Sequence, residues 1–294
     1  MTNGTKKHRM GWKPDLPDIR DYTTTRPEIS NLLRKVGISS DKSYQTENLP
    51  EKVDLRRWCS PIEDQGNLGS CTANAGAGLL EYYERRAFGN YIDASRLFLY
   101  KVTRNLIGEK GDTGAEIRNT IGAMVTVGVC PEKYYPYDIS KFDEEPSAFV
   151  YSLAENYKTT KYVRLDQPNI DKTILLNTIK TNLAAGIPAV FGFTVYSSIN
   201  QANSNGQIPY PSSKENIEGG HAIDAFGYDD NLKITNNNDN QSTVGAFIVS
   251  NSWSEEWGDN GYGYLPYKYV LSELAIDWWT LISAEWVDTG NFGF

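Results

Sequence analysis

The sequence predicts an α+β protein built of two lobes. Patterns typical of helices fill the first part of the chain and patterns typical of strands fill the later part, an order that favours segregated helical and β-rich regions. The chain has 294 residues, which is long enough for two substantial cores. Apolar residues make up 39% of it and charged residues 22%, so a folded globular protein is expected rather than a disordered one.

The first 50 residues differ in character from the rest. They are polar and interrupted by proline, and a helical pattern covers only residues 29–36. We interpret residues 1–50 as an N-terminal extension laid on, or tethered to, a main body at residues 51–294. The start of the chain lacks the apolar core of a secretory signal, so the sequence predicts synthesis in the cytosol and leaves the site of action open.

The longest predicted helix covers residues 71–87. It begins with small residues, which let a helix lie very close to another backbone, so we expect it to be central and buried. Its two glycines each cost about 1 kcal/mol in helix propensity, which packing has to offset. The other predicted helices lie at residues 95–104, 116–127 and 170–185, and a crossover rich in tyrosine and proline lies at residues 131–150.

Strand patterns begin after the last of these helices. The predicted strands lie at residues 189–195, 221–228, 246–251 and 261–266. Two polar insertions separate them, at residues 197–218 and 229–244, and residues 236–240 are typical of a solvated loop tip.

Composition excludes several classes of partner. The formal net charge is −8 and no basic stripe offsets it, so no nucleic-acid partner is expected. No apolar run reaches the roughly 20 residues that span a bilayer, so no membrane partner is expected either. Three cysteines are too few for a disulfide scaffold, and an odd count leaves at least one thiol free.

Cys71 and His221 are the residues best placed for chemistry. Cys71 stands at the start of the predicted buried helix, where free N–H groups and the helix dipole favour a thiolate. Buried cysteines are more often inert, so position alone decides little. The chain has only two histidines, and His8 lies in the extension. If Cys71 is a nucleophile, His221 is therefore its base by elimination.

Three separated motifs resemble the papain and cathepsin family of cysteine peptidases. The matching segments are residues 64–71, residues 220–222, and residues 251–253 continuing to 257–262. The resemblance covers about residues 53–269. Within the family, the chain resembles bacterial-type and viral members, and it shares some features with cathepsin B. It implies a papain-like fold with a helical lobe at about residues 60–155, an antiparallel β-rich lobe at about residues 156–294, and the active site in the cleft between them.

The resemblance also implies a role for each motif residue. Cys71 would attack a peptide carbonyl as a thiolate paired with protonated His221, and Asn251 would orient the imidazole. Gln65 would donate its side-chain amide to the oxyanion, beside the backbone N–H of Cys71. Trp253, with Trp257, would shield the bond between His221 and Asn251 from water. No metal and no organic cofactor is expected.

Substrate-binding residues follow from the same resemblance. Residues 112–115 fall where the family carries a glycine-rich strand that bonds extended substrate backbone, although Ala115 replaces a usual glycine. Ile117 and Ala222 are candidates for an apolar pocket that receives the second residue before the scissile bond. The full candidate set is Gly69, Ser70, Gly114, Ala115, Ile117, Gly220, Ala222 and Trp253.

The sequence also departs from the family pattern. Thr72 follows the nucleophile where many relatives carry tryptophan, and Leu68 replaces a disulfide cysteine. Cys59 and Cys130 are the remaining thiols, and whether they pair stays open. The histidines that give cathepsin B its exopeptidase loop are missing, which favours an endopeptidase acting on peptide or protein substrates.

Alternatives remain at this point. The chain could be a catalytically silent papain fold that serves as a binding module, or another acyl transferase with a Cys–His site. Residues 1–50 lack the long helical prosegment of typical zymogens, and residues 11–22 resemble a shorter extension that could cross and inhibit the cleft. The alternative is that this segment only holds the two lobes together and does not inhibit. We expect a monomer.

Overall fold

The computed structural model describes residues 8–38, 49–159 and 161–294. Residues 1–7 and 39–48 of the predicted extension lie outside the described residues. The helices are α1 (Pro27–Lys35), α2 (Cys71–Phe88), α3 (Arg96–Leu106), α4 (Ile117–Thr126), α5 (Ala148–Ala154), α6 (Lys172–Ala184), α7 (Lys268–Leu271) and α8 (Ala284–Val287). The strands are β1 (Lys52–Asp54), β2 (Lys161–Arg164), β3 (Ala189–Tyr196), β4 (Ile217–Thr235), β5 (Ser242–Ser250), β6 (Tyr262–Pro266) and β7 (Ala275–Ile282).

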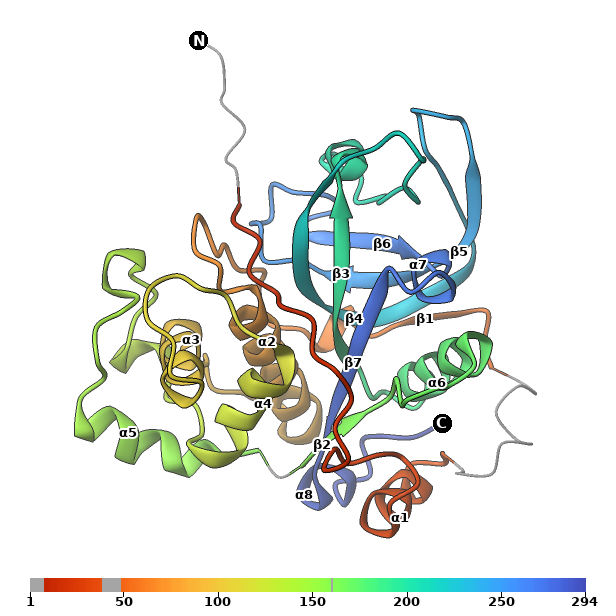
Figure 1. Ribbon diagram of the computed structural model, residues 1–294. Coiled ribbons are helices and arrows are strands. Elements are labelled where there is room, and N and C mark those ends of the chain that lie inside the picture. Colours follow the sequence, from red (N-terminus) through yellow and green to blue (C-terminus); the bar gives the residue numbers. More distant parts are fainter. Residues whose placement is uncertain (1–7, 39–48, 160) are drawn as a thin grey trace.

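The architecture is an α+β fold with helices and strands on opposite sides. Helices α2 to α5 gather on one side of the molecule and the sheet occupies the other (Figure 1). The strands form one antiparallel sheet in the order β2-β7-β3-β4-β5-β6, with β1 paired to β4. The predicted fold class is therefore confirmed.

Helix α2 is the central helix, and its small residues explain how it fits. A side chain at Gly76 would lie 3.2 Å from the sulfur of Met124 on α4, and one at Gly78 would lie 3.4 Å from the carboxylate of Asp224 on β4. Glycine at these positions lets α2 approach both neighbours closely. The helix ends at Phe88 because Gly89 adopts a left-handed conformation that begins the next turn.

The sheet is larger than the sequence pattern predicted. Strands β1, β2 and β7 were missed, as were the short helices α5, α7 and α8. The predicted insertion at residues 229–244 instead continues β4 and β5 as a long hairpin, with irregular register between Asp229 and Lys233. In β7, Trp278 and Trp279 are fully buried, and Trp278 stacks on Phe191 of β3 at 3.9 Å. These aromatic contacts fix β7 between β2 and β3 in the core.

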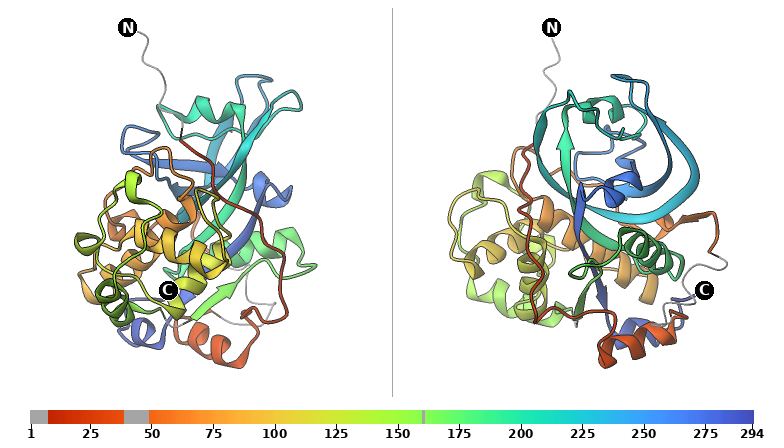
Figure 2. Two further views of the ribbon diagram at one scale, coloured as in Figure 1. Left: turned by 60° about the vertical axis from the view of Figure 1, so that its left-hand side comes forward. Right: turned by 45° about the vertical axis from the view of Figure 1, so that its right-hand side comes forward.

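The N-terminal extension runs between the two sides of the molecule. The red segment in Figures 1 and 2 descends along the boundary between helices α2 and α4 and strands β3 and β7 before it reaches α1. Trp12 pairs with Ala115 in a parallel β-bridge, and Thr23 pairs with Arg164. The extension thus contacts residues from both predicted lobes.

Candidate active site

Cys71 is the first residue of α2 and is completely buried. Ser70 precedes the helix, and its carbonyl accepts hydrogen bonds from the backbone N–H groups of Ala73 and Asn74. Burial raises the pKa of the Cys71 thiol to about 11, although backbone N–H groups, among them those of Ala222 and Gly11, oppose this rise by favouring the thiolate. In this conformation the thiol is therefore protonated at neutral pH.

His221 lies on β4 and is held by Asn251, which directly follows β5. The two strands are neighbours, and His221 Nε2 lies 2.8 Å from Asn251 Oδ1. The same oxygen accepts the backbone N–H of Ser252 at 2.8 Å, so Oδ1 is an acceptor and Nε2 donates. This assigns the other ring nitrogen, Nδ1, as the lone-pair nitrogen, and it has no hydrogen-bond partner within the described part of the chain.

Two tryptophans cover this pair. Trp253 stacks on the His221 ring with 4.8 Å between centroids, and Trp257 meets Trp253 edge to face at 5.5 Å. The His221 ring is fully buried, and burial lowers its pKa to about 4, against the opposing effect of the Asn251 bond. The imidazole is thus neutral, and its bond to Asn251 lies in surroundings from which water is excluded.

Gln65 is buried beside these residues and is fixed at both ends of its amide. Its Oε1 accepts from the Ser252 hydroxyl at 2.6 Å, which ties it to the segment that carries Asn251. Its Nε2 donates to the Leu68 carbonyl at 2.8 Å and to the Arg9 carbonyl at 2.9 Å. An amide N–H therefore points at a carbonyl of the N-terminal extension.

Residues 9–15, which we call the strap, occupy the cleft. Ala115 donates its N–H to the Gly11 carbonyl at 2.9 Å and accepts from the Lys13 N–H at 3.1 Å. The Trp12 N–H donates to the Gly220 carbonyl at 3.2 Å, so the strap backbone bonds both sides of the cleft. A side chain at Gly11 would lie only 2.0 Å from the Gly69 carbonyl oxygen, which makes glycine necessary at this close approach.

The indole of Trp12 anchors the strap in a pocket. Side chains at Gly192 or Gly220 would clash with this ring, at 1.9 Å and 2.8 Å. Trp12 Nε1 donates to Asp277 Oδ2 at 3.1 Å, and burial raises the pKa of Asp277 to about 6. Beyond the pocket, Arg118 bonds Asp15 and Asp21 of the extension.

Most of the predicted substrate-binding residues lie around the strap. Gly69, Ala115 and Gly220 contact it directly, and a side chain at Gly114 would clash with Gly11. Ile117 and Ala222 belong to the same buried apolar cluster as Trp12. The Ser70 hydroxyl instead bonds Tyr137 Oη at 2.6 Å, so it supports the start of α2.

Sequence reasoning missed Asp277 and gave the side chain of Asp112 no role. Asp277 anchors the strap, and Asp112 bonds the Gly69 N–H at 3.0 Å and Arg9 at 3.0 Å. The one available signal at Asp277 was an acidic residue inside the apolar run of residues 274–282. Within the described ranges, no group of three or more histidine, cysteine or acidic side chains is arranged to hold a metal ion.

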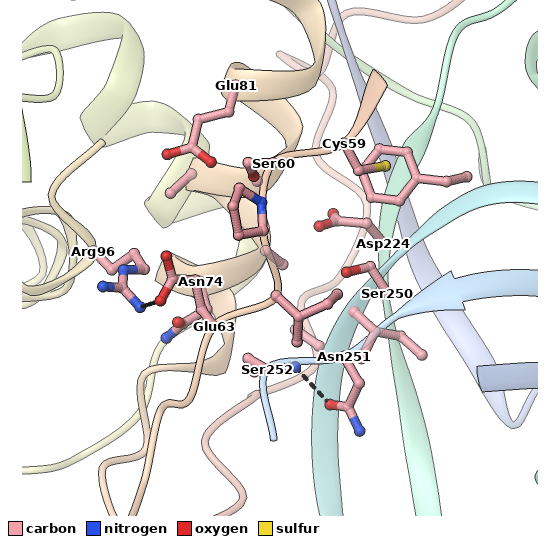
Figure 3. A pocket seen from close by; sticks show the side chains of 18 residues that line it. Cys59, Ser60, Glu63, Asn74, Glu81, Arg96, Asp224, Ser250, Asn251 and Ser252 are labelled. Carbon is pink, nitrogen blue, oxygen red and sulfur yellow. Dashed lines mark hydrogen bonds and ion pairs between the residues drawn. The ribbon is translucent and has the colours of Figure 1, made fainter. Parts of the chain in front are cut away.

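A small cavity lies behind Asn251, between α2 and the sheet (Figure 3). Its volume is about 40 Å³, and Glu81, Asp224 and Cys59 line it. Burial raises the pKa of Asp224 well above its ordinary value, and Asp224 Oδ1 has no hydrogen-bond partner in the described structure. Cys59 and Cys130 are free, so the open question of their pairing is answered: they form no disulfide.

The cavity carboxyls predict an alkaline loss of stability. Burial raises the pKa of Glu81 to about 8 from an ordinary value near 4.5. Between about pH 5 and pH 8 the folded protein keeps a proton that the unfolded chain releases, so the free energy of unfolding should fall by roughly 1.4 kcal/mol per pH unit. Glu81→Gln should flatten this slope in urea unfolding, since its amide oxygen can still accept from Ala94. Glu155→Gln, at an exposed site, is the matched control; equal slopes in both variants would contradict the assignment.

Comparison with known proteins agrees with this geometry. Residues 49–273 match the family described as papain family cysteine protease. An uncharacterized peptidase C1-like protein of Acanthamoeba polyphaga mimivirus is 36% identical, over 96% of this chain and 89% of its own. Cathepsin B-like CP3 of Giardia intestinalis is 27% identical, over 88% of this chain and 85% of its own. The crystal structure of xylellain, a cysteine protease from Xylella fastidiosa, matches with a TM-score of 0.72 and 35% identity, over 95% of this chain and 97% of its own.

The structure thus combines a buried cysteine at the start of α2 with a histidine–asparagine pair on the sheet that packs beside this helix. The chain belongs to the papain family of cysteine proteases. No helix in the described residues has the length and apolar character needed to cross a membrane.

Proposed function

We propose that the protein is an endopeptidase in which Cys71 is the nucleophile, His221 the general base and acid, and Asn251 the residue that orients His221. The bond between His221 Nε2 and Asn251 Oδ1 carries this proposal, because it leaves Nδ1 as the acceptor for the thiol proton. Transfer of that proton would create the thiolate and the imidazolium together.

The reaction then proceeds by acyl transfer. The Cys71 thiolate attacks the substrate carbonyl carbon, and the carbonyl electron pair moves to the oxygen. Collapse of this intermediate breaks the C–N bond, and His221 gives its proton to the leaving amine. Water, deprotonated by His221, attacks the resulting thioester and releases Cys71. The acyl part of the substrate would pair with Ala115, as the strap does now.

Gln65 is the proposed oxyanion donor together with the backbone N–H of Cys71. In the present conformation its Nε2 already donates to a peptide carbonyl, that of Arg9. Gln65→Glu keeps an acceptor for Ser252 but replaces the donor by an oxygen. Measured in the Trp12→Ala background, where the strap is already loosened, its kcat on a fluorogenic peptide should fall roughly 10²- to 10³-fold, whereas alkylation of Cys71 should change little. An unchanged kcat in the folded variant would remove Gln65 from the mechanism.

We further propose that the strap inhibits the enzyme as a zymogen segment does. Two observations support this. The strap covers Cys71 with its backbone at Gly11, and under this cover the pKa of Cys71 is raised while that of His221 is lowered. The thiolate–imidazolium pair is then unfavourable, because it needs the opposite shifts. Displacement of the strap would admit water and substrate and allow the pair to form.

The test of the peptidase assignment is hydrolysis of a short fluorogenic peptide by the full-length Trp12→Ala variant, in which the strap is loosened, and by the Trp12→Ala/Cys71→Ser double variant. Activity should depend on Cys71. Tight peptide binding without turnover, in variants that release the strap as well, would favour the silent binding module. Turnover that transfers the acyl group to an amine in preference to water would favour an acyl transferase.

A further inference from the structure

An open groove of about 1330 Å³ continues the cleft on the side of Trp253. Four carboxylate residues line it: Asp64, Glu218, Glu255 and Glu256. Trp253 and Trp257 provide an aromatic wall. Among the described lining residues, the one arginine is Arg9 of the strap, and there is no lysine. The walls that remain when the strap leaves are therefore acidic and aromatic.

A side chain of the extension already occupies this groove. His8 stacks on Trp253 with 5.3 Å between ring centroids and 12° between planes. Its Nε2 lies 3.1 Å from Asp64 Oδ1, and its side chain is only 12% exposed. The hollow between Trp253 and Asp64 therefore holds a flat, nitrogen-bearing group, with an aromatic face on one side and a carboxylate on the other.

Arginine matches this hollow better than other side chains do. Its guanidinium is planar, stacks on aromatic faces and can donate to a carboxylate through two N–H groups. Glu218, Glu255 and Glu256 are exposed, so each adds little alone, but acidic residues of one sign around a groove raise the local concentration of cationic ligands. A substrate glutamate in the same hollow would be repelled by these carboxylates.

The position of the groove indicates which part of a substrate it would bind, namely the leaving group. Along the extension, Trp12 lies on the Ala115 side of Cys71 and His8 lies on the Trp253 side. Under the proposed function the acyl part of the substrate pairs with Ala115, so the Trp253 side receives residues that follow the scissile bond. We propose that this groove selects peptide substrates with a cationic residue, arginine above all, directly after the scissile bond. This inference rests on the proposed function.

The test compares peptides that differ at one position. The enzyme is the full-length Trp12→Ala variant, in which the strap is loosened, and the substrates are internally quenched peptides with arginine, glutamine or glutamate after the scissile bond. The kcat/KM for arginine should exceed that for glutamate by tenfold or more, with glutamine between them. The ratio should shrink as salt is raised, because the charges around the groove are exposed.

Substitutions in the groove show which residues produce the preference for arginine. Asp64→Asn keeps an oxygen for the Gly66 N–H, and the double variant Glu255→Gln/Glu256→Gln changes exposed residues that the fold does not need. Each should reduce the arginine preference several-fold, whereas Asp239→Asn, at an exposed residue that does not line the groove, should not. Equal kcat/KM for the three peptides, or a preference that survives both groove variants, would overturn the inference.

A substrate without a residue after the scissile bond separates the two proposals. A peptidyl aminocoumarin reports only the chemistry and the acyl side. Its hydrolysis, combined with equal rates for the three quenched peptides, would leave the proposed function standing and overturn the groove assignment. Failure to hydrolyse it, with Cys71 unreactive toward alkylation, would contradict the proposed function and the inference together.

Discussion

Replacing Trp12 by alanine is expected to raise peptidase activity strongly. The indole is 8% exposed, fills the pocket at Gly192 and Gly220, and bonds Asp277. Truncation of a buried tryptophan typically costs about 3–5 kcal/mol. Because the strap and substrate compete for one cleft, a loss of about 3 kcal/mol from the closed state would raise the open fraction roughly 100-fold, until most of the protein is open.

The controls for this prediction lie in the extension itself. Trp12→Phe removes the donor to Asp277 but keeps most of the ring, so its kcat/KM on a fluorogenic peptide should lie between those of wild type and Trp12→Ala. Leu16 is 83% exposed, so Leu16→Ala should behave as wild type. If the strap is only structural, Trp12→Ala will lower the melting temperature and leave kcat/KM unchanged, and the inhibitory role would be rejected.

Replacing His221 by alanine should abolish turnover. The described structure places no other imidazole at the cleft except that of His8, which stacks on the outer face of Trp253. Without the base, Cys71 would remain a buried thiol and the leaving amine would have no proton donor. A loss of kcat on the order of 10⁴-fold or more is expected, as for a missing triad residue.

Replacing Asn251 by alanine tests the orientation of His221 separately from its role in proton transfer. Asn251→Ala leaves the imidazole in place but removes its partner at Nε2, so the fall in kcat should be smaller than for His221→Ala. Both variants should be measured in the Trp12→Ala background, with circular dichroism to establish folding. Full activity in a folded His221→Ala variant would exclude the proposed mechanism.

The candidate site residues could be named from the sequence because they stand in local motifs. Cys71, His221, Asn251 and Gln65 each sit in a short pattern, and the structure brings all four to one cleft. Asp277 was not predictable, because its partner Trp12 lies at the other end of the chain. The fit of the strap depends on glycines at distant positions, among them Gly114, Gly192 and Gly220, which no local pattern connects.

The fold was predictable where burial of one face makes apolar residues recur at a regular spacing in the sequence. It was less predictable elsewhere. Helix α2 and strand β3 follow clear patterns. Strand β7 was missed because Asp277 and the two tryptophans after it interrupt any alternation, and their placement depends on stacking against β3. The outer part of the β4–β5 hairpin was taken for an insertion because most of its residues are polar. Backbone pairing and the bond between the Thr235 and Ser242 hydroxyls hold the strands together there.

The measurement that tests the central claim most directly is labelling by an epoxide that traps papain-type thiolates, followed by peptide mass mapping. The account predicts little adduct on Cys71 in the full-length protein, rapid labelling of Cys71 in Trp12→Ala, and loss of that labelling in Trp12→Ala/His221→Ala. Rapid labelling of the full-length protein at the Trp12→Ala rate would contradict inhibition by the strap. No adduct on Cys71 in any folded variant would contradict the activated Cys71–His221 pair itself.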